Sequence, residues 1–73
     1  MNLEKQAETL NDLILINNDR VEGYQKAIDE LQPEDYELRS VFQERVNQSG
    51  QFRNELVPEV SRTGEEIAEG TMV

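Results

Sequence analysis

The sequence contains no cysteine, no histidine and no tryptophan, and its aromatic residues are limited to two phenylalanines and two tyrosines. Without cysteine there is no disulfide framework, and without cysteine and histidine the usual ligands of a structural zinc site are absent. Reaction mechanisms that use a histidine base or a cysteine nucleophile are excluded for the same reason. These absences are consistent with our expectation, completed by the motifs weighed below, of a protein that is not an enzyme and that holds no cofactor and no metal.

Positive charge and long apolar runs are also scarce. The 73 residues include 7 lysines and arginines against 16 acidic residues, which gives a net charge of −9. Nucleic-acid binding depends on basic side chains that neutralise phosphates, so we expect no nucleic-acid partner. The longest apolar run is Leu13–Ile16, whereas a membrane span needs about 20 apolar residues. Met1–Lys5 does not resemble a signal peptide, which together with the absence of cysteine fits a cytoplasmic protein.

Residues 3–31 contain no proline, and their apolar side chains recur at steps of three and four, with one step of seven across Asn17. A stripe with this spacing predicts an amphipathic helix. The stripe consists of Leu3, Ala7, Leu10, Ile14, Val21, Tyr24, Ile28 and Leu31, and it is widened on one flank by Leu13, Ile16 and Ala27. Its width suits a helix bundle better than a two-stranded coiled coil.

A second helix is predicted for residues 34–62, after a turn at 32–34 in which Pro33 opens the first helical turn. Its stripe contains Leu38, Phe42, Arg45, Ser49, Phe52 and Leu56, with Val41, Val46 and Val60 beside it. Pro58 is expected to kink or break the last turn, because proline cannot donate a main-chain hydrogen bond. The connection is short, so the two helices must run antiparallel.

The sequence thus predicts an all-α hairpin over residues 1–63. Residues 64–73, with three glutamates and two glycines, are expected to form a flexible tail or the start of a segment that leads to a third helix. A lone hairpin buries too little apolar surface to offset the entropy lost on ordering. We therefore expect half of an antiparallel four-helix bundle, completed by a second copy in a homodimer or by further helices of a longer chain. The apolar side chains expected at the interfaces are Leu10, Leu13, Ile14, Ile16, Val21, Tyr24, Ile28, Leu38, Val41, Phe42, Val46, Phe52 and Leu56.

Three polar residues, Asn17, Arg45 and Ser49, occupy core positions at the middle of the two stripes. Antiparallel pairing around the turn places Asn17 near Ser49 and Phe52, and Arg45 near Val21. A buried polar layer of this kind specifies register and helix number in coiled coils. The alternatives are a ligand or metal site at this level and a rotated seam in which Arg45 reaches water.

Several stretches of the chain resemble one bacterial family. They are the run INNDRVEGY from Ile16 to Tyr24, the run VFQE from Val41 to Glu44, and the run SGQFRNEL from Ser49 to Leu56. These stretches are similar to the first two helices of ferritin-like four-helix-bundle proteins of unknown function, within the wider rubrerythrin and ferritin superfamily. The resemblance covers residues 3–72 and implies that Gly70–Val73 opens a third helix.

The wider ferritin and rubrerythrin group binds two irons through a glutamate on the first helix and a Glu-x-x-His motif on the second. The resemblance places these ligands at Asn17, Ser49 and Phe52. None of these side chains replaces a carboxylate or an imidazole as an iron ligand. The resemblance therefore implies the scaffold without its metal centre.

Three functions are compatible with these patterns. The first is a non-enzymatic, self-associating helical module whose role in the cell the sequence does not identify. The second is an adaptor hairpin that offers its wide apolar stripe to helices of another protein. The third is an atypical bundle that binds metal or handles iron through carboxylates outside the family positions.

Overall fold

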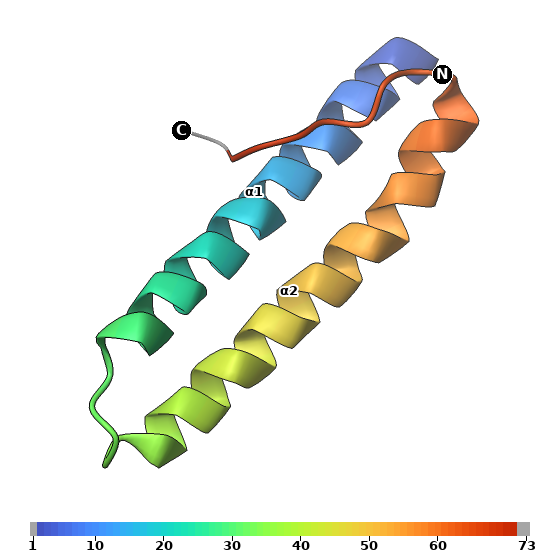
Figure 1. The fold of residues 1–73 in the computed structure, drawn as a ribbon. Helices are drawn as coiled ribbons and strands as arrows, with labels where there is room; N and C mark the ends of the chain where they lie inside the picture. The colour runs from blue at the N-terminus through green and yellow to red at the C-terminus, as the bar shows by residue number, and fades with distance from the viewer. Residues whose placement is uncertain (1, 72–73) are drawn as a thin grey trace.

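The computed structural model describes residues 2–71 and shows two long helices and no strand in this range. Helix α1 spans Leu3–Glu30 and helix α2 spans Tyr36–Thr63. The helices run antiparallel and lie side by side (Figure 1). The Cα atoms extend over 51 × 21 × 14 Å, so the hairpin is a single layer of helices. The predicted all-α hairpin is confirmed.

Helix α1 begins at an asparagine cap. The side-chain oxygen of Asn2 accepts hydrogen bonds from the main-chain N–H groups of Glu4 (2.9 Å) and Lys5 (3.3 Å). These are two of the first main-chain donors of the helix, which have no partner within the helix itself. At the other end, Leu31 has extended backbone and donates its N–H to the carbonyl of Ile28 at 3.2 Å.

The connection between the helices is longer than the predicted turn at 32–34, and α2 begins at Tyr36 rather than at residue 34. The cause is a turn closed by Asp35. Its carboxylate accepts from the main-chain N–H of Gln32 at 3.0 Å, and its own N–H donates to the carbonyl of Gln32 at 3.0 Å. Pro33 therefore lies in the connection instead of the first helical turn.

Helix α2 continues through Pro58 and ends at Thr63, so the break expected at this proline does not occur. Gly64 follows in the left-handed conformation, with φ of 81°, and donates its N–H to the carbonyl of Ser61 at 3.1 Å. A left-handed residue after the last helical turn is a common helix stop, and glycine adopts this conformation without strain.

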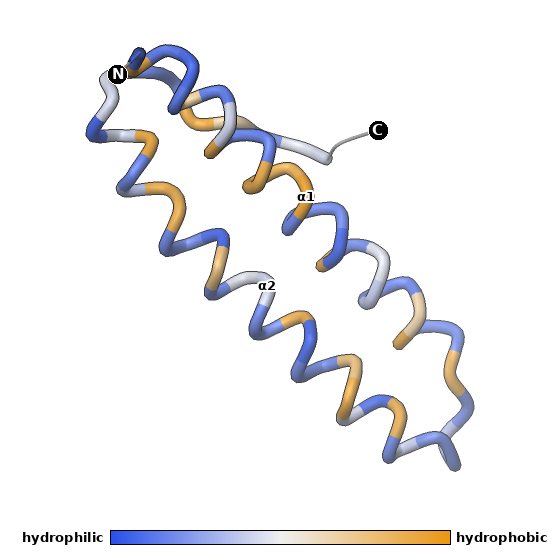
Figure 2. Tube along the Cα trace, turned by 180° about the vertical axis from the view of Figure 1, so that it is seen from behind, coloured by the Kyte–Doolittle hydropathy of each residue, from blue (hydrophilic) through white to orange (hydrophobic). Residues whose placement is uncertain are grey.

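Hydrophobic positions recur along both helices (Figure 2). On α1, Ala7 and Ile14 are buried, and Leu10, Ile16, Val21, Tyr24 and Ile28 are half-buried. On α2, the buried and half-buried positions that repeat with heptad spacing are Phe42, Val46, Ser49, Arg53, Leu56 and Val60. The rings of Tyr24 and Phe42 contact each other with centroids 5.8 Å apart.

The observed seam on α2 differs from the predicted stripe. Leu38, Arg45 and Phe52 were expected at core positions, but all three are exposed in the hairpin. The helix is rotated so that Val46 and Val60 pack toward α1 in their place. This rotation leaves the Arg45 guanidinium in water, whereas burying it without a partner would be costly.

The segment after α2 turns back along α1 (Figure 1). Asn11 holds it twice, because its side-chain nitrogen donates to the carbonyl of Glu66 at 2.9 Å and its side-chain oxygen accepts from the N–H of Ala68 at 2.8 Å. Asn18, two turns further on, donates to the carbonyl of Gly70 at 2.8 Å. The described part of the tail is therefore fixed to α1 in extended form. Met72 and Val73, which were expected to open a third helix, lie outside the described residues.

Candidate functional site

One side of the hairpin carries exposed apolar side chains from both helices, and we call it the open face. It is defined by Leu13 on α1 and by Val41 and Phe52 on α2, which are 42%, 46% and 61% exposed. The tail lies on the other side of α1. Asn18, which binds the tail, is two residues from Arg20, and at roughly 100° per residue the two side chains lie on nearly opposite sides of the helix. Arg20 and Leu13 are seven residues apart and share the open face.

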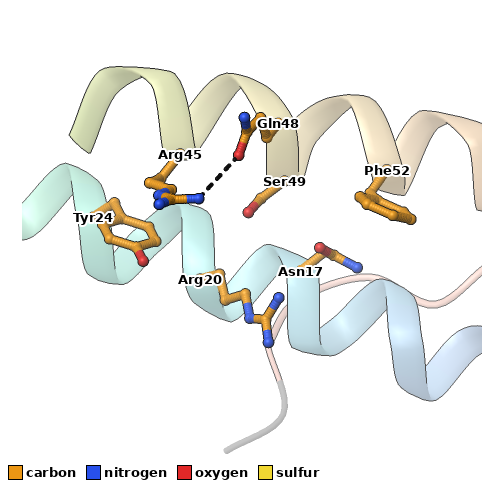
Figure 3. Close-up of a pocket in the computed structure, with 7 residues that line it drawn as sticks. All are labelled: Asn17, Arg20, Tyr24, Arg45, Gln48, Ser49 and Phe52. Atoms are coloured by element: carbon orange, nitrogen blue, oxygen red, sulfur yellow. Dashed lines mark hydrogen bonds between the residues drawn. The ribbon is translucent and has the colours of Figure 1, made fainter. Parts of the chain in front are cut away.

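A hollow of about 360 Å³ lies at the middle of the open face. It is lined by Asn17, Arg20 and Tyr24 from α1 and by Arg45, Gln48, Ser49 and Phe52 from α2 (Figure 3). The three residues predicted as a polar layer thus lie around one hollow. The three positions that the resemblance assigned to iron ligands line it as well.

Asn17 and Ser49 are both buried within the single hairpin, at 8% exposure each. The side-chain nitrogen of Asn17 donates to the carbonyl of Leu13 at 2.9 Å, within its own helix. Within residues 2–71, no hydrogen bond joins the Asn17 side chain to α2. The hairpin therefore brings these polar side chains together without linking them into a network.

Arg45 lies at the edge of the hollow and is exposed, so in the hairpin it corresponds to the rotated-seam alternative. Its guanidinium donates to the side-chain oxygen of Gln48 at a long 3.4 Å (Figure 3). Arg20 is exposed on the opposite wall. In the described part of the chain the one salt bridge is elsewhere, between Arg62 and Glu59. The hollow therefore gathers two positive charges without a carboxylate, in a chain of net charge −9.

Two of the lining residues, Arg20 and Gln48, were not predicted from the sequence. A signal for Arg20 was present, since it follows Leu13 by one heptad on the flank that widens the first stripe. Gln48 had no comparable signal, because its place on the wall depends on the rotation of α2. Together the lining side chains offer guanidinium, amide and hydroxyl groups, which suit recognition of a carboxylate.

No metal-binding cluster and no membrane-spanning helix is found between residues 2 and 71. There, no group of three or more histidine, cysteine, aspartate or glutamate residues is arranged to hold a metal ion. Neither helix is long and apolar enough to cross a membrane. At the positions that the resemblance assigned to iron ligands, the hairpin presents one amide, one hydroxyl and one phenyl ring, which fit no iron centre.

Comparison with known proteins gives one match. The model of a family described as a domain of unknown function, DUF2383, matches residues 5–73, a range that includes α1 from its third residue onward and all of α2. No curated protein and no solved structure matches the chain.

Proposed function

The chain belongs to the DUF2383 family of domains of unknown function, and we propose that it acts as a non-enzymatic, self-associating helical module. Two hairpins would pack through their open faces into a four-helix bundle, with the ferritin-like scaffold that the sequence resembles and without its metals. The module would serve assembly rather than a chemical reaction.

The small core of the hairpin carries this proposal. Within residues 2–71 the buried apolar side chains are Ala7, Ile14 and Val60, none of which is a large aromatic residue. Larger apolar groups such as Phe52 remain largely exposed on the open face. Exposed apolar surface that is contiguous and rimmed by polar residues is typical of protein interaction sites. A second layer of helices would cover it.

The dimensions of the open face suit a second copy. Two helices of 28 residues are about 42 Å long, and the layer is 21 Å wide, which gives roughly 900 Å² of face. Each partner in a standard protein interface buries about 800 Å². A homodimer with twofold symmetry needs only this one face, because the same patch serves both subunits.

Size-exclusion chromatography with light scattering tests the proposal. We expect a mass of twice 8.4 kDa, falling toward the monomer on dilution. Phe52→Glu places a charge on the open face and should shift the protein to monomer. Tyr36→Glu is the matched control, because Tyr36 is also a largely exposed aromatic residue (69%) on α2 but lies off the open face.

Two other outcomes are informative. A well-folded monomer at all concentrations contradicts self-association. A monomer with little helix, which folds only when helices of another protein are added, favours the adaptor hairpin instead.

A further inference from the structure

We infer that two copies pair antiparallel through α2, about a twofold axis near Phe52, so that Arg45 of each copy meets Glu59 of the partner subunit. This inference rests on the proposed self-association and specifies its geometry. It selects one of the two symmetric ways in which the open faces can meet.

Four exposed residues of α2 form a straight column on the open face, which begins at Leu38 and continues through Arg45, Phe52 and Glu59. Arg45, Phe52 and Glu59 are spaced by seven residues, which is two helical turns less about 20°. Neighbours in the column are therefore about 10.5 Å apart along the helix. Phe52 lies midway between a positive and a negative charge, so an antiparallel copy centred on Phe52 places each charge opposite its complement.

The alternative symmetry brings like charges together. The Tyr24–Phe42 ring contact sets the register of the hairpin, in which facing residue numbers sum to 66. Arg20 therefore lies at almost the same height as Arg45. A twofold axis parallel to the helices would place α2 on α1 of the partner, and Arg45 would then face Arg20 of the partner subunit. This repulsion opposes association. A twofold axis perpendicular to the helices places α2 on α2 of the partner instead and avoids the contact between arginines.

With this axis, residues 41–63 of α2 overlap with the same helix of the partner subunit. Helix α2 spans Tyr36–Thr63, so Phe52 lies within about 4 Å of its midpoint at 1.5 Å per residue. The ring of Phe52, now 61% exposed, would be covered by its symmetry mate. Glu59 keeps a partly exposed carboxylate, of which one oxygen accepts from Arg62 at 2.6 Å. Its second oxygen can accept from Arg45 of the partner subunit.

Charge reversal tests the pairing. Arg45→Glu and Glu59→Arg should each weaken the dimer about tenfold, because each creates two like-charge contacts across the interface. The double variant Arg45→Glu/Glu59→Arg restores opposite charges and should bind within about threefold of the unmodified chain. Lys26→Glu, an exposed charge reversal on α1 away from the open face, is the control and should stay within about threefold. Dissociation constants from sedimentation equilibrium at fixed salt give the comparison.

Disulfide trapping provides an independent test, since the natural chain has no cysteine. Phe52→Cys should yield a covalent dimer under mild oxidation, because the two introduced thiols meet at the axis. Val41→Cys, exposed on the same helix, should not, since the two copies of residue 41 would be about 33 Å apart.

The outcomes separate this inference from the proposed function. If the unmodified chain stays monomeric, both are wrong. If it dimerises but the double charge variant fails to recover, or if Val41→Cys crosslinks as readily as Phe52→Cys, the pairing through α2 is wrong and self-association stands.

Discussion

Asn17 shows that a polar residue can occupy the core without a hydrogen bond between the helices. Its amide bonds to Leu13 of the same helix, whose carbonyl also serves the helix ladder. We expect Asn17→Leu to raise the free energy of unfolding by about 1 kcal/mol, since an apolar side chain replaces a buried amide and leaves no donor unsatisfied. Urea unfolding followed by circular dichroism measures the change. Asn47→Leu on the exposed side of α2 is the control, and a destabilised Asn17→Leu protein would contradict the argument.

The sequence predicted the position of Asn17 and Ser49 but not that of Arg45. Antiparallel pairing around the turn placed Asn17 and Ser49 near each other, and in the structure both line one hollow. Arg45 depended on the rotation of α2, which carries two overlapping heptad stripes. Successive residues are about 100° apart around a helix, and the two stripes differ by one residue. Periodicity alone therefore could not decide whether Arg45 or Val46 faces α1.

At the scale of elements, Pro58 lies inside a helix that does not break. The carbonyl of Asn54 has no N–H to accept from, and the backbone before a proline disfavours helix. Pro58 is exposed, so its replacement leaves no cavity. We expect Pro58→Ala to raise the melting temperature, with a gain of about 1–3 kcal/mol. Pro33→Ala, in the connection, should instead lower stability slightly, and equal effects at the two positions would show that Pro58 is unstrained.

The helices were predictable because their signals are local, whereas the connection and the tail were not. The alternation of apolar steps and the cap at Asn2 each involve residues within a few positions of one another. The start of α2 depends on the side chain of Asp35, which competes with the helix for main-chain donors. The path of the tail depends on Asn11 and Asn18, more than fifty residues earlier, which as isolated polar residues are typical of a solvated surface.

At the scale of the whole molecule, the Cα trace is only 14 Å thick, so the hairpin has one layer of helices. Its apolar stripes have no second layer of the same chain to cover them within the described residues. If a second copy supplies the other layer, folding and association are linked, and the melting temperature depends on concentration. We expect a rise of about 5 °C for each tenfold increase in concentration, from the enthalpy typical of chains of this size. Differential scanning calorimetry over a hundredfold range tests this, and Phe52→Glu should abolish the dependence. A melting temperature that does not move contradicts self-association.

The need for a second layer followed from the width of the sequence stripes, but the way in which the layers meet did not. Choosing between the two symmetries requires the rotation of α2, because that rotation brings Arg45, Phe52 and Glu59 to the surface in one column. It also requires the register fixed by the contact of Tyr24 with Phe42. Both depend on packing between segments distant in sequence.

The asparagine contacts to the tail have a consequence for how the end of this chain can vary. Asn11 and Asn18 bind only peptide groups of the tail, so these contacts depend on the course of its main chain and not on its side chains. A foreign stretch grafted over residues 65–71 would follow the same track, provided that position 68 is not proline and keeps its amide hydrogen, and that position 70 stays glycine, whose φ of 90° other residues rarely adopt. Within these limits the segment can accept a changed sequence while the helix beneath it stays as it is.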